Sequence, residues 1–361
     1  MKNRAGIFAL MITGILLALL LAEILVRIFI PRYKMTTWIE MHPRGFMMNQ
    51  SGVEAFHEFR DRRITYHLNE QGLRGEELTS SDDKRVLLLG DSYTFGLLLH
   101  QEDTFADLLQ LKADQHFEKQ SIRILNGGVG GAGLADWPAW LEVKGPEIEP
   151  DKVILFLNTS DIDRAISKNL FVIDEADSTL VNSMYWKPNE FMFRLGRQGW
   201  YQWIQRHSIL ANILVTMAWE HLYFTDITNN FDPETSEVPV PAAKDLYPES
   251  DYSVRLADKL VLRMNEWCEK NNCDFILATT GFFDPDKMGD HTANFYHFIT
   301  ENFPHDIRFF DNTPCIYEKS DGNYEPLLIP GDGHPNEQGA SLVAECSWQW
   351  LLPLLNPESS D

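Results

Sequence analysis

A serine at the end of an apolar run is the first residue of this sequence that could do chemistry. Ser92 follows Gly90 and Asp91, at the end of the run 85–89. A short apolar run that ends in turn-forming residues predicts a buried parallel strand. Open α/β sheets carry their chemistry at the carboxyl ends of such strands. Ser92 is therefore a candidate nucleophile, and an ordinary strand–turn–helix joint with a capping serine is the alternative interpretation.

A serine becomes a nucleophile when a neighbouring base takes its proton, and His334 is the best candidate base among the eleven histidines. It lies in the tetrapeptide Asp332-Gly-His-Pro, directly before a predicted helix. A turn at that place can direct an imidazole toward the carboxyl edge of the sheet. Asp332 would then orient the ring and stabilise the imidazolium. The alternative is a plain turn into the helix, with Asn336 as its N-cap.

Two further segments could supply hydrogen-bond donors to an oxyanion. The glycine-rich stretch 127–133 follows the apolar run 122–126, and the N–H of Gly131 is our candidate donor there. Backbone N–H groups suit this role in glycine-rich turns, because no side chain blocks the approach. Asn158 and Ser160 follow the next apolar run and could add a side-chain donor.

The same glycine-rich stretch admits a competing interpretation. Gly128-Val-Gly-Gly-Ala-Gly133 satisfies the G-x-G-x-x-G pattern of dinucleotide sites and follows a predicted strand. Pro138, however, falls early in the helix that such a site requires. We therefore predict no nucleotide cofactor, and the chain has no Walker A pattern and no Gly-x-Ser-x-Gly pattern.

The elements that must position these residues alternate along the chain. Apolar strand-like runs are separated by segments with helical spacing, which predicts a parallel sheet with helices on both faces. We expect an α/β fold of three layers, α/β/α and flavodoxin-like, with about five parallel strands. The predicted strands are 85–90, 122–126, 152–157, 274–280 and 307–310, and the predicted helices are 103–115, 253–270 and 337–352.

The N-terminus predicts a membrane anchor. Residues 5–22 carry no charge and follow Lys2 and Arg4, and after Glu23 the apolar run extends to residue 30. That length can span a bilayer if Glu23 and Arg27 lie near the interface. A cleavable signal peptide is the alternative, but Leu20 stands where its small-x-small cleavage pattern needs a small residue. Charges on both sides leave the orientation open.

We divide the chain into an anchor at 1–30, an irregular lead-in at 31–83 and a main domain at 84–356. The main domain has a helical and then acidic insertion at about 165–250, and residues 282–304 could form a lid or a helix over the site. The net charge of −22 argues against a nucleic-acid partner. Four cysteines without paired C-x-x-C motifs predict no zinc site, and their disulfide pairing stays open.

Together these blocks resemble the SGNH, or GDSL-type, hydrolase family. Gly90-Asp-Ser92 matches its first block, the segment 126–131 its second, and Asp332-Gly-His-Pro its last. In the family the final glycine of the second block, here Gly131, supplies an oxyanion N–H. The anchor with Leu25-Val-Arg27 and the segments 69–75 and 90–96 look like the membrane-anchored envelope branch. That resemblance implies a domain outside the cytoplasm, periplasmic or external.

Two blocks depart from the family pattern. The third block usually reads Gly-x-Asn-Asp, whereas Asn158-Thr-Ser-Asp161 puts Ser160 at the asparagine position and Asn158 at the glycine position. We expect either Ser160 or Asn158 to complete the oxyanion hole. The family aspartate usually precedes the histidine by three residues, whereas Asp332 precedes His334 by two.

The resemblance implies a serine-dependent esterase or O-acyltransferase that acts on an ester of a cell-envelope glycan or lipid. Ser92 would attack the ester carbonyl, His334 would transfer the proton and Asp332 would orient it. The expected partners are an acyl-ester substrate, such as an envelope polysaccharide, and the membrane. The alternative is a glycan-binding or scaffolding module with little or no activity. We predict no metal and no cofactor.

Overall fold

The computed structural model describes residues 2–29, 33–78, 84–117, 122–158, 160–168, 170–174, 176–182, 194–196, 198–215, 217–218, 251–282, 296, 300 and 307–356. The chain forms two compact units. The smaller one comprises residues 1–37, 55–65 and 189–230, and the larger one comprises the rest. The predicted acidic stretch 225–250 lies outside the described residues, and so does the predicted lid at 282–304 except for residues 282, 296 and 300.

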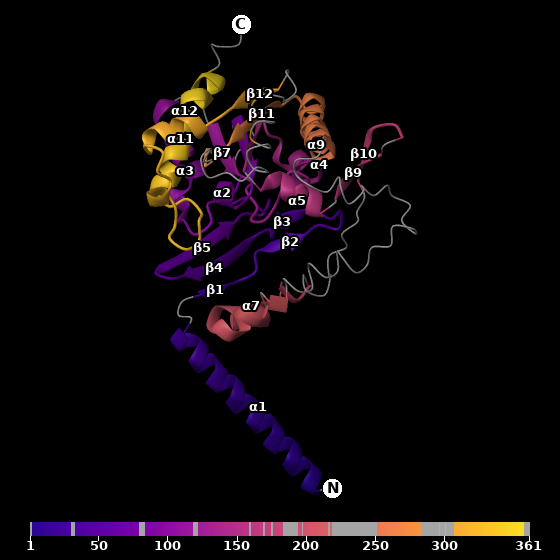
Figure 1. Cartoon of the computed structure of the whole chain (residues 1–361), viewed down its shortest axis with the longest axis vertical. Coiled ribbons are helices and arrows are strands. Elements are labelled where there is room, and N and C mark those ends of the chain that lie inside the picture. The colour runs from indigo at the N-terminus through magenta and orange to yellow at the C-terminus, as the bar shows by residue number, and fades with distance from the viewer. Residues whose placement is uncertain are drawn as a thin grey trace. The chain divides into compact units, whose positions relative to one another are not determined.

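A parallel sheet of five strands forms the centre of the larger unit (Figure 1). The strand order is β12-β11-β8-β6-β7, so β6 lies between β8 and β7. The bounds are β6 Lys84–Gly90, β7 Ile122–Asn126, β8 Lys152–Leu157, β11 Asp274–Thr279 and β12 Arg308–Phe310. The predicted fold class is confirmed.

Alternation along the strands divides the core into two layers. Val86 and Leu88 of β6 pack into one apolar cluster, whereas Leu87 and Leu89 pack into the other. Successive side chains of a strand point to opposite faces, so a strand covered on both sides becomes apolar throughout. This is why the central strand reads as a continuous apolar run.

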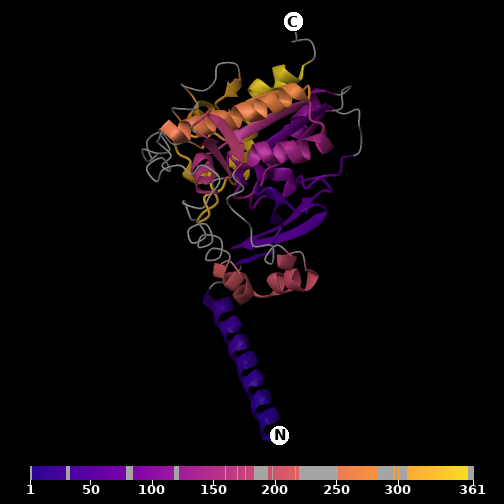
Figure 2. The ribbon, with the colours of Figure 1, turned by 90° about the vertical axis from the view of Figure 1, so that its right-hand side faces the viewer.

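Helices cover both faces of the sheet, and Figure 2 looks onto the face that α4 and α9 cover. That layer consists of α4 Asp136–Ile148, α5 Asp161–Lys168 and α9 Asp251–Lys270. The opposite layer consists of α3 Phe105–His116, α11 Thr313–Lys319 and α12 Glu337–Leu355. A disulfide joins Cys315 of α11 to Cys346 of α12.

The lead-in at 31–83 is more regular than expected, because it contains five short strands. Strands β1, β4 and β5 form one sheet in that order, and β2 pairs antiparallel with β3. No Asn-Gly or Asp-Gly turn marks these strands in the sequence, and three-residue strands show no measurable periodicity. Their bounds are β1 Tyr33–Met35, β2 Ile39–Met41, β3 Met47–Asn49, β4 Val53–Phe59 and β5 Arg62–Leu68.

The region predicted as a helical and acidic insertion, 165–250, begins differently. After α5, strands β9 Phe171–Asp174 and β10 Thr179–Asn182 pair antiparallel. Aromatic and β-branched residues at 171–173 favour a strand there. The helical, aromatic-rich part follows in the smaller unit as α7 Gly199–His207.

The smaller unit contains the N-terminal helix α1 Lys2–Phe29. Its part Gly6–Phe29 has 24 residues and a mean hydropathy of 2.6, and none of it is buried in the protein. The helix is therefore long and apolar enough to cross a membrane, a property that it shares with signal sequences.

Candidate active site

Ser92 is the first residue of the short helix α2 Ser92–Phe95, two residues beyond the end of β6. This tight strand-to-helix turn depends on Gly90, because a Cβ there would lie 2.1 Å from the Thr94 hydroxyl and 2.8 Å from the Phe156 carbonyl oxygen. Asp91 caps α2, since its carboxylate accepts the N–H of Tyr93 at 2.8 Å. The turn therefore places the serine at the carboxyl edge of the central strand.

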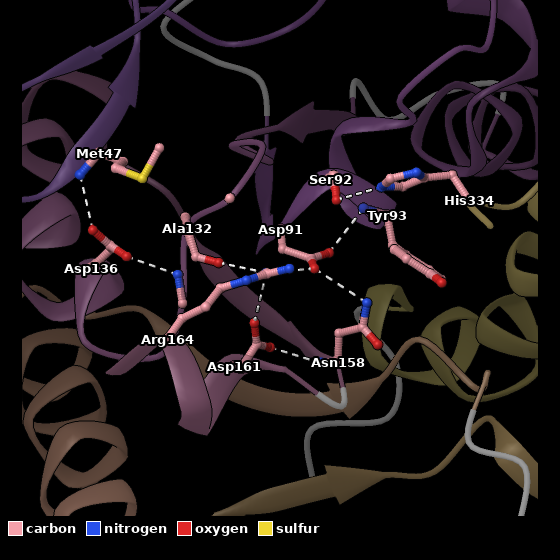
Figure 3. A network of polar contacts seen from close by, with 12 residues as sticks. Met47, Asp91, Ser92, Tyr93, Ala132, Asp136, Asn158, Asp161, Arg164 and His334 are labelled. Carbon is pink, nitrogen blue, oxygen red and sulfur yellow. Dashed lines mark hydrogen bonds and ion pairs between the residues drawn. The ribbon is translucent and has the colours of Figure 1, made fainter. Parts of the chain in front are cut away.

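His334 lies beside Ser92, and Asp332 lies on the other side of its ring. The distance from His334 Nε2 to Ser92 Oγ is 2.7 Å (Figure 3). The distance from His334 Nδ1 to Asp332 Oδ1 is 2.5 Å. The turn before α12 thus brings a carboxylate to the imidazole although the two residues are only two positions apart. In this arrangement Nε2 can accept the serine proton while the carboxylate accepts the Nδ1–H.

Tyr93 holds the turn that carries the histidine, a role that the sequence did not indicate. Its hydroxyl donates to the Gly333 carbonyl at 3.0 Å, and its ring centroid lies 5.2 Å from that of His334. Burial raises the pKa of Tyr93 to about 12, and nearby carboxylates add to the shift. The hydroxyl therefore stays protonated and donates near neutral pH.

The glycine-rich loop after β7 lies directly against α2. A Cβ at Gly128 would lie 2.2 Å from the backbone nitrogen of Phe95, so only glycine allows this approach. Within the part of the chain that the structure describes, the N–H groups of Ser92, Gly130 and Gly131 have no acceptor. These three groups are consequently available to a ligand oxygen.

Asn158 and Ser160 occupy different surroundings. Asn158 is buried at the end of β8, and its Nδ2 donates to Asp91 Oδ2 at 3.2 Å. The amide thereby contacts the residue that precedes Ser92. Ser160 is half-buried, and its carbonyl accepts the N–H of Arg164 at 3.1 Å as α5 begins. Neither side chain has a hydrogen bond to Ser92.

A charged face of α5 supports the site, and it was not predicted. Arg164 Nη1 donates to Asp91 Oδ2 at 2.8 Å and to the Ala132 carbonyl at 2.9 Å (Figure 3). Lys168 Nζ donates to Asp136 Oδ2 at 2.6 Å and to the Gly131 carbonyl at 2.9 Å. Two cations of one helix therefore hold adjacent carbonyls of the glycine-rich loop.

Burial sets the protonation behaviour of this network. Burial, followed by repulsion from Asp91, raises the pKa of Asp161 well above its usual value. Burial also lowers the pKa of Lys168, although the nearby Asp136 opposes that shift. For Arg164 the attraction of Asp91 and Asp161 outweighs burial and raises the pKa. The guanidinium accordingly remains charged and the network stays paired.

A signal for this face was present in the sequence. Asp161, Arg164 and Lys168 are spaced three and then four residues apart, which places them on one side of a helix. Ile162, Ala165 and Ile166 between them are buried. Charged residues on a helix whose other positions are apolar indicate a buried ion network, because isolated buried charges are too costly.

Asp136 binds the glycine-rich loop that carries the G-x-G-x-x-G pattern. Its carboxylate accepts the N–H of Gly133 at 2.7 Å and the N–H of Met47 at 2.9 Å (Figure 3). One amide of the loop before α4 and one amide of β3 therefore already bind a carboxylate of the chain. Among the described residues, no group of three or more His, Cys, Asp or Glu side chains is placed to hold a metal ion.

Several solved structures resemble this chain. One is TesA, at 15% identity and a TM-score of 0.40, covering 75% of this chain and 100% of TesA. Another is a member of the lipolytic protein G-D-S-L family from Veillonella parvula, at 13% identity and a TM-score of 0.38. The match covers 74% of this chain and 97% of that protein. A third is a catalytic mutant of Axe2, an acetylxylan esterase from Geobacillus stearothermophilus, at 12% identity and a TM-score of 0.39. The match covers 76% of this chain and 95% of Axe2.

No protein-family model and no curated protein matches the chain. Similarity at this distance says nothing of the reaction, which has to be inferred from the site.

Proposed function

We propose that this protein is a GDSL-type serine esterase or O-acyltransferase. The observation that carries the proposal is the continuous hydrogen-bonded series from Asp332 through His334 to Ser92, with distances of 2.5 and 2.7 Å. A serine, a histidine and a carboxylate in this order form the nucleophile–base–orienter arrangement of covalent acyl transfer.

The reaction follows from these positions. His334 Nε2 takes the proton of Ser92 as Oγ attacks the acyl carbon of an ester. The resulting oxyanion accepts the N–H groups of Ser92 and Gly131, which have no other acceptor among the described residues. His334 then gives its proton to the leaving alkoxide, which departs as an alcohol. An acyl-serine remains on the enzyme.

The second half of the reaction returns the free serine. His334 takes a proton from water or from an acceptor hydroxyl, whose oxygen attacks the acyl-serine. His334 then returns that proton to Ser92 Oγ as the bond between Oγ and the acyl carbon breaks. Water yields a carboxylic acid, and a sugar hydroxyl yields a new ester. Both outcomes use the same three residues, so the acceptor bound next to Ser92 decides between hydrolysis and transfer.

Two features support a substrate in the cell envelope. Helix α1 is long and apolar enough to hold the protein at a membrane. The disulfide between Cys315 and Cys346 belongs to an oxidising compartment, as found outside the cytoplasm. We accordingly propose a single-pass protein with an extracytoplasmic catalytic domain that acts on an acylated envelope glycan or lipid.

A fluorophosphonate probe and a short-chain aryl ester test this function together. We expect the wild-type protein to be labelled and to turn over the ester. Ser92→Ala should lose labelling and ~10⁴–10⁶-fold of its turnover. The matched control is Ser320→Ala at the end of α11, which should behave as wild type. A folded wild-type protein that is neither labelled nor active would instead identify a non-catalytic binding module.

A further inference from the structure

We propose that residues 198–215 and 217–218, here called the interfacial segment, lie in the headgroup layer of an anionic membrane. Their exposed aromatic and apolar side chains would contact lipid. The inference concerns the smaller unit alone and does not depend on the chemistry of Ser92.

The interfacial segment has an apolar face that none of the described residues of its unit covers. In α7, Trp200 is 59% exposed and Trp203 is 61% exposed, whereas Tyr201 and Gln205 are buried. At 3.6 residues per turn these two pairs lie on opposite sides of the helix. The helical residues that follow repeat the pattern, with exposed Leu214 and Met217.

Specific polar contacts join the interfacial segment to α1. The carboxylate of Glu23 accepts the Ser208 hydroxyl at 2.7 Å, the N–H of Ile209 at 3.1 Å and the N–H of Leu210 at 3.0 Å. Arg27 binds the Glu23 carboxylate at 2.7 Å and also donates to the carbonyl of His207. The carboxylate of Glu23 thus accepts hydrogen bonds from the N–H groups at the start of the helical turns that follow Ser208.

The position of Glu23 places this joint near the membrane surface. Glu23 lies six positions before Phe29, the end of the apolar helix, so the two residues are about 9 Å apart along the helix axis. The helix has 24 residues, whereas a hydrocarbon layer of ~30 Å needs about 20. Glu23 is therefore close to the edge of the hydrocarbon, and the segment that it binds reaches the headgroup layer.

The charge of this region fits an anionic surface. Residues 191–219 include Arg194, Arg197, Arg206 and His207 but no Asp or Glu, although the chain has 53 acidic residues and a net charge of −22. Basic residues beside exposed tryptophans are the composition of interfacial helices, because headgroups attract the cations and tryptophan prefers the interface. The strongly acidic remainder of the chain would be repelled there.

The same contacts argue that α1 stays attached. Cleavage of a signal peptide after Ala22 would leave Glu23 at a new chain end without the helix that holds it, and the N–H groups of Ile209 and Leu210 would lose a fixed acceptor. The intact mass of the protein isolated from membranes tests this point. We expect the full chain, and a mature form that lacks residues 1–22 would overturn the proposal.

Lipid-restricted quenching tests the location of the interfacial segment. The full chain is reconstituted in phosphatidylglycerol-containing vesicles with an environment-sensitive fluorophore on Trp203→Cys or Met217→Cys. The control is Glu318→Cys on α11 of the other unit, and protein without an introduced cysteine gives the background. Cys268 and Cys273 are buried and Cys315 and Cys346 are paired, so this background should be low.

We expect headgroup-proximal spin-labelled lipid to quench the probes at 203 and 217 several-fold more than the probe at 318. Iodide in the aqueous phase should quench the probe at 318 more strongly than the probes at 203 and 217. Iodide quenching at 203 and 217 as strong as at 318 would overturn the proposal. Equal lipid quenching in neutral and anionic vesicles would overturn its electrostatic part. Neither result depends on esterase activity, so the proposed reaction can fail while this inference stands.

Discussion

Arg164 Nη1 lies 2.8 Å from Asp91 Oδ2 and donates to the Ala132 carbonyl as well, at 2.9 Å. Asp91 precedes Ser92 and caps the helix that begins there, whereas Ala132 follows Gly131. One guanidinium therefore joins the turn of the proposed nucleophile to the loop of the proposed oxyanion donors. Neither partner can move without disturbing the other, which makes Arg164 a positioning residue.

Substitution of Arg164 should lower turnover more than it weakens substrate binding. Arg164→Ala leaves the fully buried Asp91 without its cation, and a small shift of the serine or the loop can cost ~10²-fold in kcat. KM should change little, and Arg164→Lys should recover part of the loss. The control is Arg123→Ala, which removes a surface pair with Glu76. An unchanged kcat in Arg164→Ala would refute the positioning role.

Asp332→Asn tests whether the carboxylate orients the histidine. The amide keeps the size of the side chain but removes the charge that stabilises the imidazolium, so kcat should fall by ~10⁴-fold. Kinetics on an aryl ester, with circular dichroism as the check of folding, measure this. The control is Asp321→Asn in an exposed turn, where asparagine tolerates the positive φ of 51°. Near-wild-type turnover of Asp332→Asn would leave a backbone carbonyl as the orienting group.

Gly128→Ala should destabilise the fold and impair the site. The added methyl group would lie 2.2 Å from the nitrogen of Phe95 and 2.6 Å from its Cα, and backbone atoms cannot give way as a flexible side chain can. Overpacking of this kind costs ~1–3 kcal/mol, which urea unfolding can measure. Gly199→Ala, whose Cβ would meet no atom within 4 Å, is the control. Equal midpoints for both variants would show that the loop does not pack on α2 as described.

Asp161 should make stability depend on pH. Its pKa is raised in the folded protein, by burial first and by Asp91 second, so the folded state binds its proton more tightly than the unfolded state. The associated stability is present below the usual value of 3.8 and is lost as pH rises through the raised folded pKa.

Asp161→Asn should therefore flatten this dependence. Urea unfolding between about pH 4 and pH 8 gives the slope for each protein. The wild-type free energy of unfolding should fall more steeply with rising pH than that of Asp161→Asn. Parallel slopes would mean that Asp161 titrates alike in the folded and unfolded chains.

Local sequence patterns were sufficient to predict the central sheet and the residues at its carboxyl edge. The central strands are apolar because both faces of the sheet are covered, so β7 and β8 could be predicted with their bounds at 122–126 and 152–157. The ends of these strands pointed to Ser92, Gly131 and Asn158 as neighbours, because parallel strands end at one edge. The place of His334 before a helix pointed to the same edge.

The strands of the lead-in show where local patterns failed. Strands β1 to β3 have three residues each, and the partner of β1 lies elsewhere in the chain. Tyr33, for example, pairs with Phe59. Such short strands exist only through these pairings, so no periodicity within them predicts a strand.

By itself the sequence determined the kind of fold and the chemical groups at its carboxyl edge, because these follow from strand periodicity and turn chemistry. Only the tertiary structure decided which donors and acceptors meet. Asp332 reaches His334 despite the short spacing, and Asn158 binds Asp91. Arg164 is 73 residues from Asp91 in the chain, and their pairing exists because the order of strands brings β6 beside β8 and the helix that follows it.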